Sequence, residues 1–582
     1  MMSKPATDEL RGHFAAVRGL FVTVGAFSFA INMLMLAPSI YMLQVYDRVL
    51  TSRNATTLLM LTLIVLGLFA LEALLEGVRS RALIRGSAAL DLKLGPRVFD
   101  ASFQRTLRGR AGNASQSLGD LASLRQFLTG KGLFAFFDAP WTPIYLLVIF
   151  LLSPWLGLFA LVAAVILLAL AWINEKMTAP LLGEASKEAQ VANHYAGSHL
   201  RNAEVIDAMG MLGALRQRWL RKQGHMLVLQ ARASDRAASV GAWSRLARMG
   251  FQSGVLGLGA LLVIDNQLSP GGMIAASILL GRALAPVDQA IGNWRSLVQA
   301  RGAYRRLDEL LAAHPPAAER TALPRPRGFV QADNLAVGPP GVRVPVLKGI
   351  KFGAKPGMLV VVVGPSAAGK STLARALVGV WSPLGGAVRL DGAEVHTWDK
   401  EELGPHIGYL PQDVELFEGT VAENIARFGV ADDGRIVQAA KRAGVHELIL
   451  RLPQGYETPL GEGGTALSGG QRQRIGLARA MYGEPALVVL DEPNANLDEA
   501  GDAALVEALG QMRRDQRTVF VMSHRMNILA LADAVMMLAN GSIQMYGPRD
   551  EVMKALAAQR KPGPNAAGPQ AAGKDADQEN AA

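Results

Sequence analysis

The 582-residue chain contains no cysteine. This absence excludes a disulfide framework, a thiolate metal site and a cysteine nucleophile. Charged residues are also few, at 19% of the chain, while half of all residues are hydrophobic and the mean hydropathy is +0.21. A cleavable signal peptide is not evident, because the first apolar run is too long for one and no A-x-A site follows it. The length predicts two or more domains.

Long apolar runs fill the chain up to residue 295. A helix needs about 20 mostly apolar residues to cross the hydrocarbon core of a bilayer. Six segments meet this requirement, at 21–43, 57–76, 133–152, 154–174, 246–264 and 272–291. The last two are rich in Gly and Ala, so buried helices are the alternative for that pair. We predict an all-α transmembrane domain of six helices in the lipid bilayer.

The formal net charge of +10 has two interpretations. A nucleic-acid-binding protein gathers its basic residues on one face, whereas a membrane protein carries them in its cytoplasmic loops. Here Lys and Arg flank the apolar runs, before the first, after the second and sixth, and between the fourth and fifth. The sequence therefore predicts no nucleic-acid partner and places both termini in the cytoplasm. The turns on the opposite side are short, near 44–56, 153–154 and 265–271.

Glu72 and Glu76 stand one helical turn apart at the end of the second span. Carboxylates inside a membrane are usually functional, so a substrate-facing or proton-carrying pair is one interpretation. The other interpretation, which we favour, places them at the cytoplasmic interface and pairs them with Arg79.

The second half has the pattern of a soluble α/β domain. Prolines and small residues mark a linker at 313–328, between a transmembrane domain at 1–312 and a second domain at 329–558. In that domain short apolar runs alternate with helical segments. Residues 559–582 are rich in Ala, Gly, Pro and charge, and we expect them to form a disordered tail.

A phosphate-binding motif follows the first buried strand of this domain. The run at 359–363, Leu-Val-Val-Val-Val, leads into G-x-x-x-x-G-K-S and then into a helix. Glycines let backbone N–H groups surround phosphate oxygens, and the helix N-terminus favours an anion. The lysine can reach the β- and γ-phosphates, and the serine hydroxyl can bind Mg²⁺. The predicted nucleotide-binding residues are Gly364, Pro365, Ser366, Ala367, Ala368, Gly369, Lys370, Ser371 and Thr372.

A second apolar run, at 486–490, ends in Asp491 and Glu492. Asp491 is placed to hold Mg²⁺ through water. Glu492 is the candidate catalytic base that polarises the attacking water. An Asp-Glu pair after an apolar run is common and by itself only weakly indicates an ATPase site. Its position downstream of the phosphate-binding motif strengthens this interpretation.

The segment at 467–474, Leu-Ser-Gly-Gly-Gln-Arg-Gln-Arg, resembles the signature of the ABC ATPases, a branch of the P-loop proteins. In that family the signature reaches across a dimer to the γ-phosphate of ATP on the partner's phosphate loop. The resemblance adds Ser468, Gly469, Gly470 and Gln471 to the predicted nucleotide site. It also implies that one chain cannot complete a site, so a homodimer with two equivalent sites is the expected assembly.

Other family positions carry over individually. Gln412 matches the glutamine that contacts Mg²⁺ and senses the membrane domain, and His524 matches the catalytic switch histidine that contacts the γ-phosphate. The loop at 496–498 matches the one that crosses to the partner subunit. Family members usually stack an aromatic ring on adenine, but Pro339 takes that position here. The resemblance implies an ATPase coupled to transport that uses ATP and Mg²⁺, with metal ligands at Ser371, Gln412 and Asp491.

The polar helical stretches at 77–132 and 175–245 are expected to extend the spans into the cytoplasm. Each extension must turn back, and we predict these turns near 119–127 and 204–212. Either turn is a candidate contact with an ATPase domain, or a plain helix–helix connection.

Motifs in the membrane half resemble the permease/ATPase family of type I secretion systems. They lie at 41–54, 137–145 and 278–294. Such proteins export unfolded polypeptides with a periplasmic adaptor and an outer-membrane channel. The first span begins near residue 21, so the N-terminal peptidase-like domain of some relatives is expected to be absent, as in the protease-exporting branch. Asp47 and Arg48 are candidates for adaptor contact, although a solvated turn explains them equally well.

Two other functions remain open. A half-exporter of lipids or small hydrophobic molecules would use the same ATPase domain with a large hydrophobic cavity in place of a narrow polar pore. A non-transporting ABC ATPase would not carry six apolar spans. We predict ATP-driven export of a polypeptide across the bacterial inner membrane, with the ATPase domain in the cytoplasm.

Overall fold

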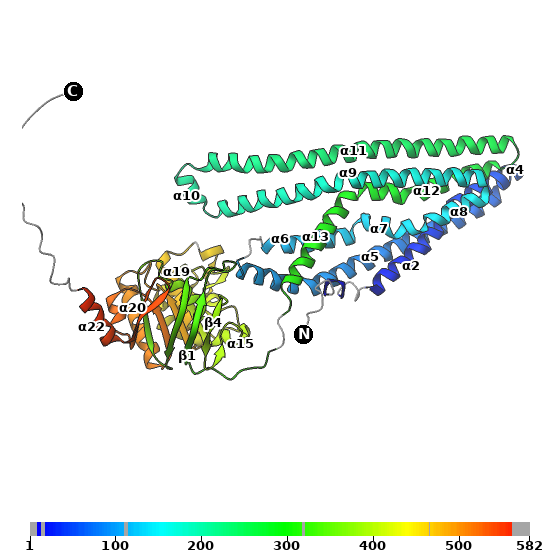
Figure 1. The fold of residues 1–582 in the computed structure, drawn as a ribbon. Helices are drawn as coiled ribbons and strands as arrows, with labels where there is room; N and C mark the ends of the chain where they lie inside the picture. The colour runs from blue at the N-terminus through cyan, green and yellow to red at the C-terminus, as the bar shows by residue number, and fades with distance from the viewer. Residues whose placement is uncertain (1–8, 13–17, 110–113, 317–319, 465, 561–582) are drawn as a thin grey trace, which may run out of the picture. The chain divides into compact units, whose positions relative to one another are not determined.

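A computed structural model describes residues 9–12, 18–109, 114–316, 320–464 and 466–560. Helices α2–α13 belong to one compact unit, and elements β1–α22 belong to another. We call these the helical unit and the α/β unit (Figure 1). From residue 561 onward, the predicted tail at 559–582 lies outside the described residues. Its first two residues, 559 and 560, belong to helix α22.

The helical unit is built from long helices with short connections. Its elements are α2 (Arg18–Leu34), α3 (Ala37–Gln44), the π-helix η1 (Val45–Val49), α4 (Leu50–Ser52), α5 (Ala55–Leu107), α6 (Ala114–Thr129), α7 (Lys131–Asp138), the 3₁₀-helix η2 (Ala139–Trp141), α8 (Thr142–Leu152), α9 (Pro154–Leu200), α10 (Ala203–Ala208), α11 (Leu212–Ile264), α12 (Pro270–Gly292) and α13 (Trp294–Ala313). Among the described residues, six helical segments are long and apolar enough to cross a membrane, one for each predicted span. The prediction of six apolar helices is therefore confirmed.

The polar extensions are continuous with the spans. Helices α5 and α11 each contain 53 residues and α9 contains 47, far more than the roughly 20 that cross a bilayer. Helices α9 and α11 run side by side and are joined through α10 (Figure 1), so the turn predicted near 204–212 is present. The turn predicted near 119–127 is wrong, because this segment lies inside α6. The chain leaves α5 earlier, after Leu107, and Gly109 has a φ of +64°.

The far-side connection predicted at 44–56 is mostly helical. The chain stays helical to Ser52, through one turn of π-helix. Within that turn the Asp47 carboxylate accepts hydrogen bonds from the Gly271 N–H at 2.8 Å and from the Ser269 hydroxyl at 2.5 Å. These groups stand at the start of α12, where Ser269 is the N-cap and its hydroxyl accepts from the Gly272 N–H, so Asp47 supports the cap of that helix. A solvated turn is therefore the wrong explanation for Asp47, whereas the neighbouring Arg48 is exposed.

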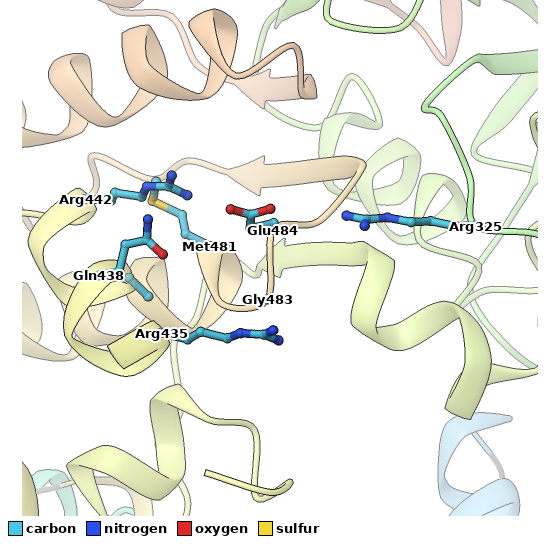
Figure 2. A pocket seen from close by; sticks show the side chains of 8 residues that line it. Arg325, Arg435, Gln438, Arg442, Met481, Gly483 and Glu484 are labelled. Carbon is cyan, nitrogen blue, oxygen red and sulfur yellow. The ribbon is translucent and has the colours of Figure 1, made fainter. Parts of the chain in front are cut away.

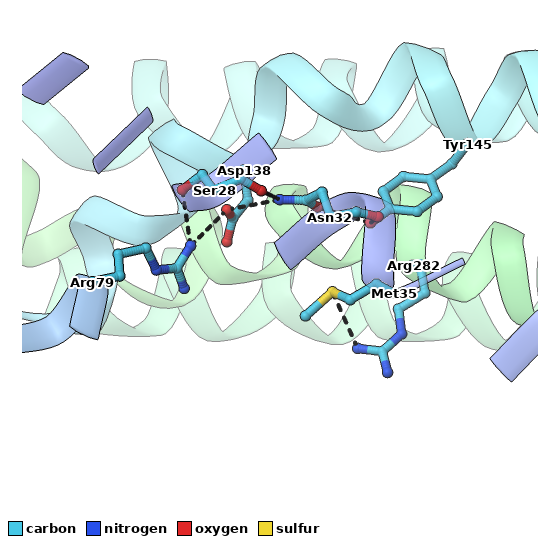
Figure 3. Close-up of polar contacts among 7 residues, drawn as sticks. All are labelled: Ser28, Asn32, Met35, Arg79, Asp138, Tyr145 and Arg282. Atoms are coloured by element: carbon cyan, nitrogen blue, oxygen red, sulfur yellow. Dashed lines mark hydrogen bonds and ion pairs between the residues drawn. The ribbon is translucent and has the colours of Figure 1, made fainter. Parts of the chain in front are cut away.

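A buried polar network joins α2, α5, α7 and α8 (Figure 3). The Arg79 guanidinium forms an ion pair with Asp138 at 3.0 Å and donates to the Ser28 hydroxyl at 2.9 Å. Asn32 donates to the same Asp138 oxygen at 3.0 Å and accepts from the Tyr145 hydroxyl at 2.8 Å. The expected pairing of Arg79 with the glutamates one and two turns before it is therefore wrong, because its partner is the aspartate at the end of α7.

The α/β unit contains two sheets and surrounding helices. Its strands are β1 (Val330–Val337), β2 (Leu347–Ala354), β3 (Leu359–Val363), β4 (Gly385–Leu390), β5 (Ala393–Glu394), β6 (Ile407–Leu410), β7 (Gly419–Thr420), β8 (Pro459–Leu460), β9 (Leu487–Asp491), β10 (Thr518–Met522), β11 (Ala534–Ala539) and β12 (Ser542–Pro548). Its helices are α14 (Lys370–Leu377), α15 (Lys400–Leu403), α16 (Val421–Ile425), α17 (Asp433–Arg442), α18 (His446–Leu450), α19 (Gly469–Met481), α20 (Glu499–Arg514), α21 (Met526–Leu529) and α22 (Arg549–Arg560).

The larger sheet has the strand order β12-β11-β3-β10-β9-β6, and the five strands from β11 to β6 are parallel. Helices cover both of its faces. Leu359 and Val361 of β3 belong to one buried hydrophobic cluster, and Val360 and Val362 belong to the other. A strand buried on both faces reads as an unbroken apolar run, which explains the sequence of β3. The smaller antiparallel sheet has the order β2-β1-β4-β5.

Candidate nucleotide-binding site

Four neighbouring parallel strands deliver the predicted site residues to one edge of the larger sheet. The phosphate-binding loop follows β3, His524 follows β10, Asp491 ends β9 and Gln412 follows β6. Ligands of open α/β sheets bind at the carboxyl ends of the strands. Segments far apart in the sequence are therefore brought to the edge at which ligands of such sheets bind.

The loop at 364–371 requires small residues at particular positions. Gly369 has a φ of +100°, and Ala367 has a φ of +65°. A Cβ on Gly364 would lie 2.2 Å from the Leu538 carbonyl oxygen, so no other residue fits that position. The loop passes directly into α14, which begins at Lys370.

The first turn of α14 is open to an anion. Gly369 precedes the helix and offers no side chain to cap it, so the N–H groups of the first turn keep their hydrogen-bonding capacity. The Lys370 Nζ donates to the carbonyl oxygens of Gly364 at 2.8 Å and Pro365 at 3.2 Å, which holds the ammonium group over the loop. Donors and positive charge thus surround the space that the motif assigns to phosphate.

Asp491 is a buried acid at the end of β9, close to the Ser371 hydroxyl. It is 1% exposed, and neither carboxylate oxygen makes a hydrogen bond of normal geometry. Burial raises the pKa of Asp491, and the nearby Ser371 hydroxyl and basic side chains offset part of this rise. A buried carboxylate is costly unless it is paired with a cation or hydrogen-bonded. Asp491 with Ser371 beside it therefore fits a hard, oxygen-seeking cation such as Mg²⁺.

Glu492 and Gln412 are in direct contact. The Gln412 side-chain amide donates to a Glu492 carboxylate oxygen at 3.1 Å. Glu492 has a φ of +48°, and its N–H donates to the Met522 carbonyl oxygen at 3.0 Å. This left-handed backbone conformation follows the end of β9 at Asp491. The structure thus places the candidate base beside the acid predicted to hold Mg²⁺, while its catalytic role remains a prediction.

The signature segment begins helix α19 with a capping box. The Ser468 hydroxyl accepts from the Gln471 N–H at 3.2 Å, and the Gln471 side chain accepts from the Ser468 N–H at 2.8 Å. The hydroxyl proton of Ser468 is not used by this arrangement, and the residue is exposed. A Cβ on Gly470 would lie 2.7 Å from the Asn496 carbonyl oxygen. The second glycine is therefore required by the loop at 496–498, which packs against the helix start.

Two residues of this helix hold the site together and were not singled out from the sequence. The Gln473 amide is buried and donates to the Pro493 carbonyl oxygen at 3.1 Å. Arg474 pairs with Asp498 at 2.8 Å, and Asp498 also caps α20 by accepting from the Gly501 N–H. Both residues lie inside the signature at 467–474, so its repeated Gln-Arg pattern was the feature of the sequence that could have pointed to them. They connect the signature to the segment that carries Glu492.

His524 is exposed, and the hydrogen bonds of the described residues do not link it to Glu492 or Asp491. Its neighbours are fixed instead. The Ser523 hydroxyl donates to the Asn494 side chain at 3.1 Å, and Arg525 forms an ion pair with Asp502. His524 therefore stands on an anchored loop with its ring open to a ligand, and its contact with a γ-phosphate remains a prediction.

A hollow of about 220 Å³ lies elsewhere in the α/β unit (Figure 2). Its lining residues are Arg325, Arg435, Gln438, Ala439, Arg442, Met481, Gly483 and Glu484. None of them belongs to the motifs above. Arg435 pairs with Asp432, Arg442 with Asp515, and Glu484 with Arg517, so most of its charges are compensated within the protein. This hollow is not the predicted nucleotide site.

Two family models match the chain, and they divide it as the fold does. Residues 21–285 match the ABC transporter transmembrane region, and residues 347–495 match the ABC transporter model. The second match spans the phosphate loop, the signature and the end of β9. Together the two matches define the class of the protein as an ABC transporter.

Similarity to known proteins assigns the chain to a narrower group within this class. The chain is 46% identical over 538 residues to the type I secretion system ATP-binding protein PrsD of Rhizobium meliloti (strain 1021), covering 92% of both chains. It is 29% identical to the cyclolysin secretion/processing ATP-binding protein CyaB of Bordetella pertussis, covering 92% of this chain and 76% of the relative. A solved bacterial Atm1-family ABC exporter with ATP bound shares the fold, with a TM-score of 0.80, 21% identity, and coverage of 95% of this chain and all of that one. The chain therefore belongs to the ABC transporter family, in the group of type I secretion system ATP-binding proteins, and is a multi-pass inner-membrane protein.

Proposed function

We propose that this protein exports an unfolded polypeptide across the inner membrane and uses ATP hydrolysis to drive the export. The observation that carries the proposal is the joining of two features in one chain. Six apolar helices are fused to an α/β unit whose phosphate loop, Asp491, Glu492 and Gln412 gather at one sheet edge. The 46% identity to a type I secretion protein favours polypeptide over lipid as the cargo.

In this proposal, different residues of the chain bind the phosphates, accept the proton of the water and hold the metal ion. The loop amides and Lys370 bind the phosphates of ATP, and the first turn of α14 adds its favourable dipole. Glu492, oriented by Gln412, accepts the proton of the attacking water as general base. Asp491 and Ser371 are the residues that would hold Mg²⁺, with Gln412 as the third predicted ligand. When bound, this ion neutralises charge on the phosphates.

Two chains are needed for a complete site in this proposal. Ser468 is exposed and keeps a free hydroxyl proton at the start of α19, so it can donate to ATP bound by a second copy. A homodimer with twofold symmetry would then contain two equivalent sites. A periplasmic adaptor and an outer-membrane channel complete the expected assembly, with the α/β unit and both termini in the cytoplasm.

Secretion from living cells tests the function even when the cargo is unidentified. The chromosomal copy is replaced by a Glu492→Gln variant, and the proteins of the culture medium are compared with those of the parent strain by mass spectrometry. We expect one or a few polypeptides to disappear from the medium while the variant remains in the membrane at the parent level. An unchanged medium together with altered membrane lipids would instead support the lipid half-exporter.

A further inference from the structure

Arg282, in one of the described membrane spans, has no ionic partner among the described residues. It lies near the middle of α12, about 18 Å along the helix from Pro270 at 1.5 Å per residue. Within the part of the chain that the structure describes, no carboxylate lies at ion-pair distance from its guanidinium. The recorded contact is from Nη1 to the Met35 sulfur at 3.8 Å (Figure 3), and a thioether is a weak acceptor. Charged residues inside membrane spans face a protein interior or water and mark functional paths.

The surroundings of Arg282 differ from those of a lipid-facing residue. Helix α12 packs against α3, α7, α8, α9 and α11, and it is the most buried of the six described spans. From Gly271 to Asp288, a range described throughout, Arg282 is the one residue that is exposed. A lipid-facing helix has a different surface, as α5 shows with exposed apolar side chains such as Leu63 and Leu66. The narrow exposed strip of α12 therefore carries a charge where a lipid-facing helix carries leucines.

The nearby polar network does not compensate this charge. Asp138 is held by Arg79 and Asn32, and the Tyr145 hydroxyl donates to Asn32. Figure 3 shows Arg282 apart from these contacts, beside Met35. The acid of the network is thus occupied, and the cation of α12 remains available to an anion from outside this chain.

We propose that Arg282 lines a water-filled path through the membrane unit and binds carboxylate side chains of the passing polypeptide. This inference rests on the proposed function, because it names a determinant of cargo selection for that export. A guanidinium pairs with carboxylates through two parallel hydrogen bonds. Arg282 is a specificity-determining residue in this account: it favours acidic stretches of an unfolded chain over neutral ones.

The natural absence of cysteine gives a direct test of the water-filled path. Arg282→Cys and Leu63→Cys each create a single thiol in an otherwise cysteine-free chain. Proteoliposomes of each variant are treated with a charged, membrane-impermeant methanethiosulfonate. We expect Cys at 282 to react at least ten times faster than Cys at 63, which replaces an exposed leucine of α5. Equally slow labelling of both variants would place Arg282 in lipid or in a closed contact and overturn the path.

Peptide binding tests the ligand class. The probes are two unfolded synthetic peptides of equal length, one rich in Glu and one rich in Gln, and their affinities are measured by fluorescence anisotropy on the purified protein. We expect the acidic peptide to bind the natural chain at least tenfold more tightly than the neutral one. Arg282→Gln should remove this preference, and Arg282→Lys should keep most of it. Equal affinities in the natural chain, or no binding of either peptide, would overturn the proposal.

The two proposals can fail separately. If the medium loses polypeptides in the Glu492→Gln strain but the acidic peptide has no preference, polypeptide export stands and the role of Arg282 is refuted. If the acidic preference depends on Arg282 but the medium is unchanged, the site stands and the export of polypeptides is refuted.

Discussion

Removing one charge of the buried ion pair in the helical unit is expected to lower the free energy of unfolding more than removing both charges. Arg79 is 3% exposed, and its guanidinium contacts Asp138, Ser28 and the ring of Phe134, whose centroid lies 4.3 Å from Arg79 Cζ. Asp138→Asn keeps the shape and the acceptor for Asn32, but it leaves the Arg79 charge without its counterion. An uncompensated buried charge costs about 3–5 kcal/mol.

The double variant separates the charge from the packing. Arg79→Met with Asp138→Asn removes both charges at nearly constant volume, and such replacements of buried pairs are often close to neutral. We therefore expect the double variant to be more stable than Asp138→Asn alone, with a coupling energy of about 2–3 kcal/mol between the two sites. Arg85→Met, at an exposed arginine of the same helix, should change stability by less than about 0.5 kcal/mol.

Unfolding in detergent with increasing denaturant, followed by the fluorescence of the eight tryptophans, measures these differences. The four members of the cycle and the Arg85→Met control are compared under identical conditions, with gel filtration confirming a monodisperse protein. Additive losses, in which the double variant equals the sum of the single ones, would show that Arg79 and Asp138 do not act as a pair. That result would refute the network as a stabilising element.

Three further predictions concern other parts of the chain. Gly470→Ala places a Cβ 2.7 Å from the Asn496 carbonyl oxygen, so we expect at least a tenfold loss of ATPase activity, whereas Gly353→Ala, which meets no atom within 4 Å, should retain activity. Asp47→Ala removes the acceptor for the Gly271 N–H in the first turn of α12, beside the Ser269 cap, and should destabilise the helical unit by about 1 kcal/mol in the same unfolding assay. Arg427 donates to four backbone carbonyl oxygens, so Arg427→Met should destabilise the α/β unit by about 3 kcal/mol or more, and a melting temperature equal to that of the natural chain would contradict this role.

The strands and loops that carry the candidate nucleotide site could be predicted from the sequence because their signals are local. The strand β3 has the predicted bounds, and the phosphate loop and Asp491 follow buried strands as expected. A strand buried on both faces and a glycine-rich loop each leave a continuous mark in the sequence. The contact between Gln412 and Glu492 arises because β6 lies beside β9 in the sheet. The order of the motifs along the chain suggests this neighbourhood of strands but does not determine it.

Polar pairing inside the helical unit could not be predicted in the same way. Arg79 lies close in sequence to Glu76, yet its partner is Asp138, because packing brings α7 against α2 and α5 at this level. Asp47 accepts hydrogen bonds at the start of α12, a helix that begins at Pro270, far along the chain. The turn predicted near 119–127 lies inside α6, which continues through Gly119 because a glycine in a helix costs only about 1 kcal/mol and tertiary packing tolerates it. Long-range contacts override local signals in each case.

ATP hydrolysis by the purified protein in detergent is the measurement that tests the account most directly. Turnover is compared among the natural chain, Glu492→Gln and Lys370→Ala. We expect turnover in the natural chain and its loss in both variants, with Glu492→Gln still binding ATP and accumulating as a dimer. If Glu492→Gln hydrolyses ATP at the natural rate, Glu492 is not the general base and the assignment of the site is contradicted.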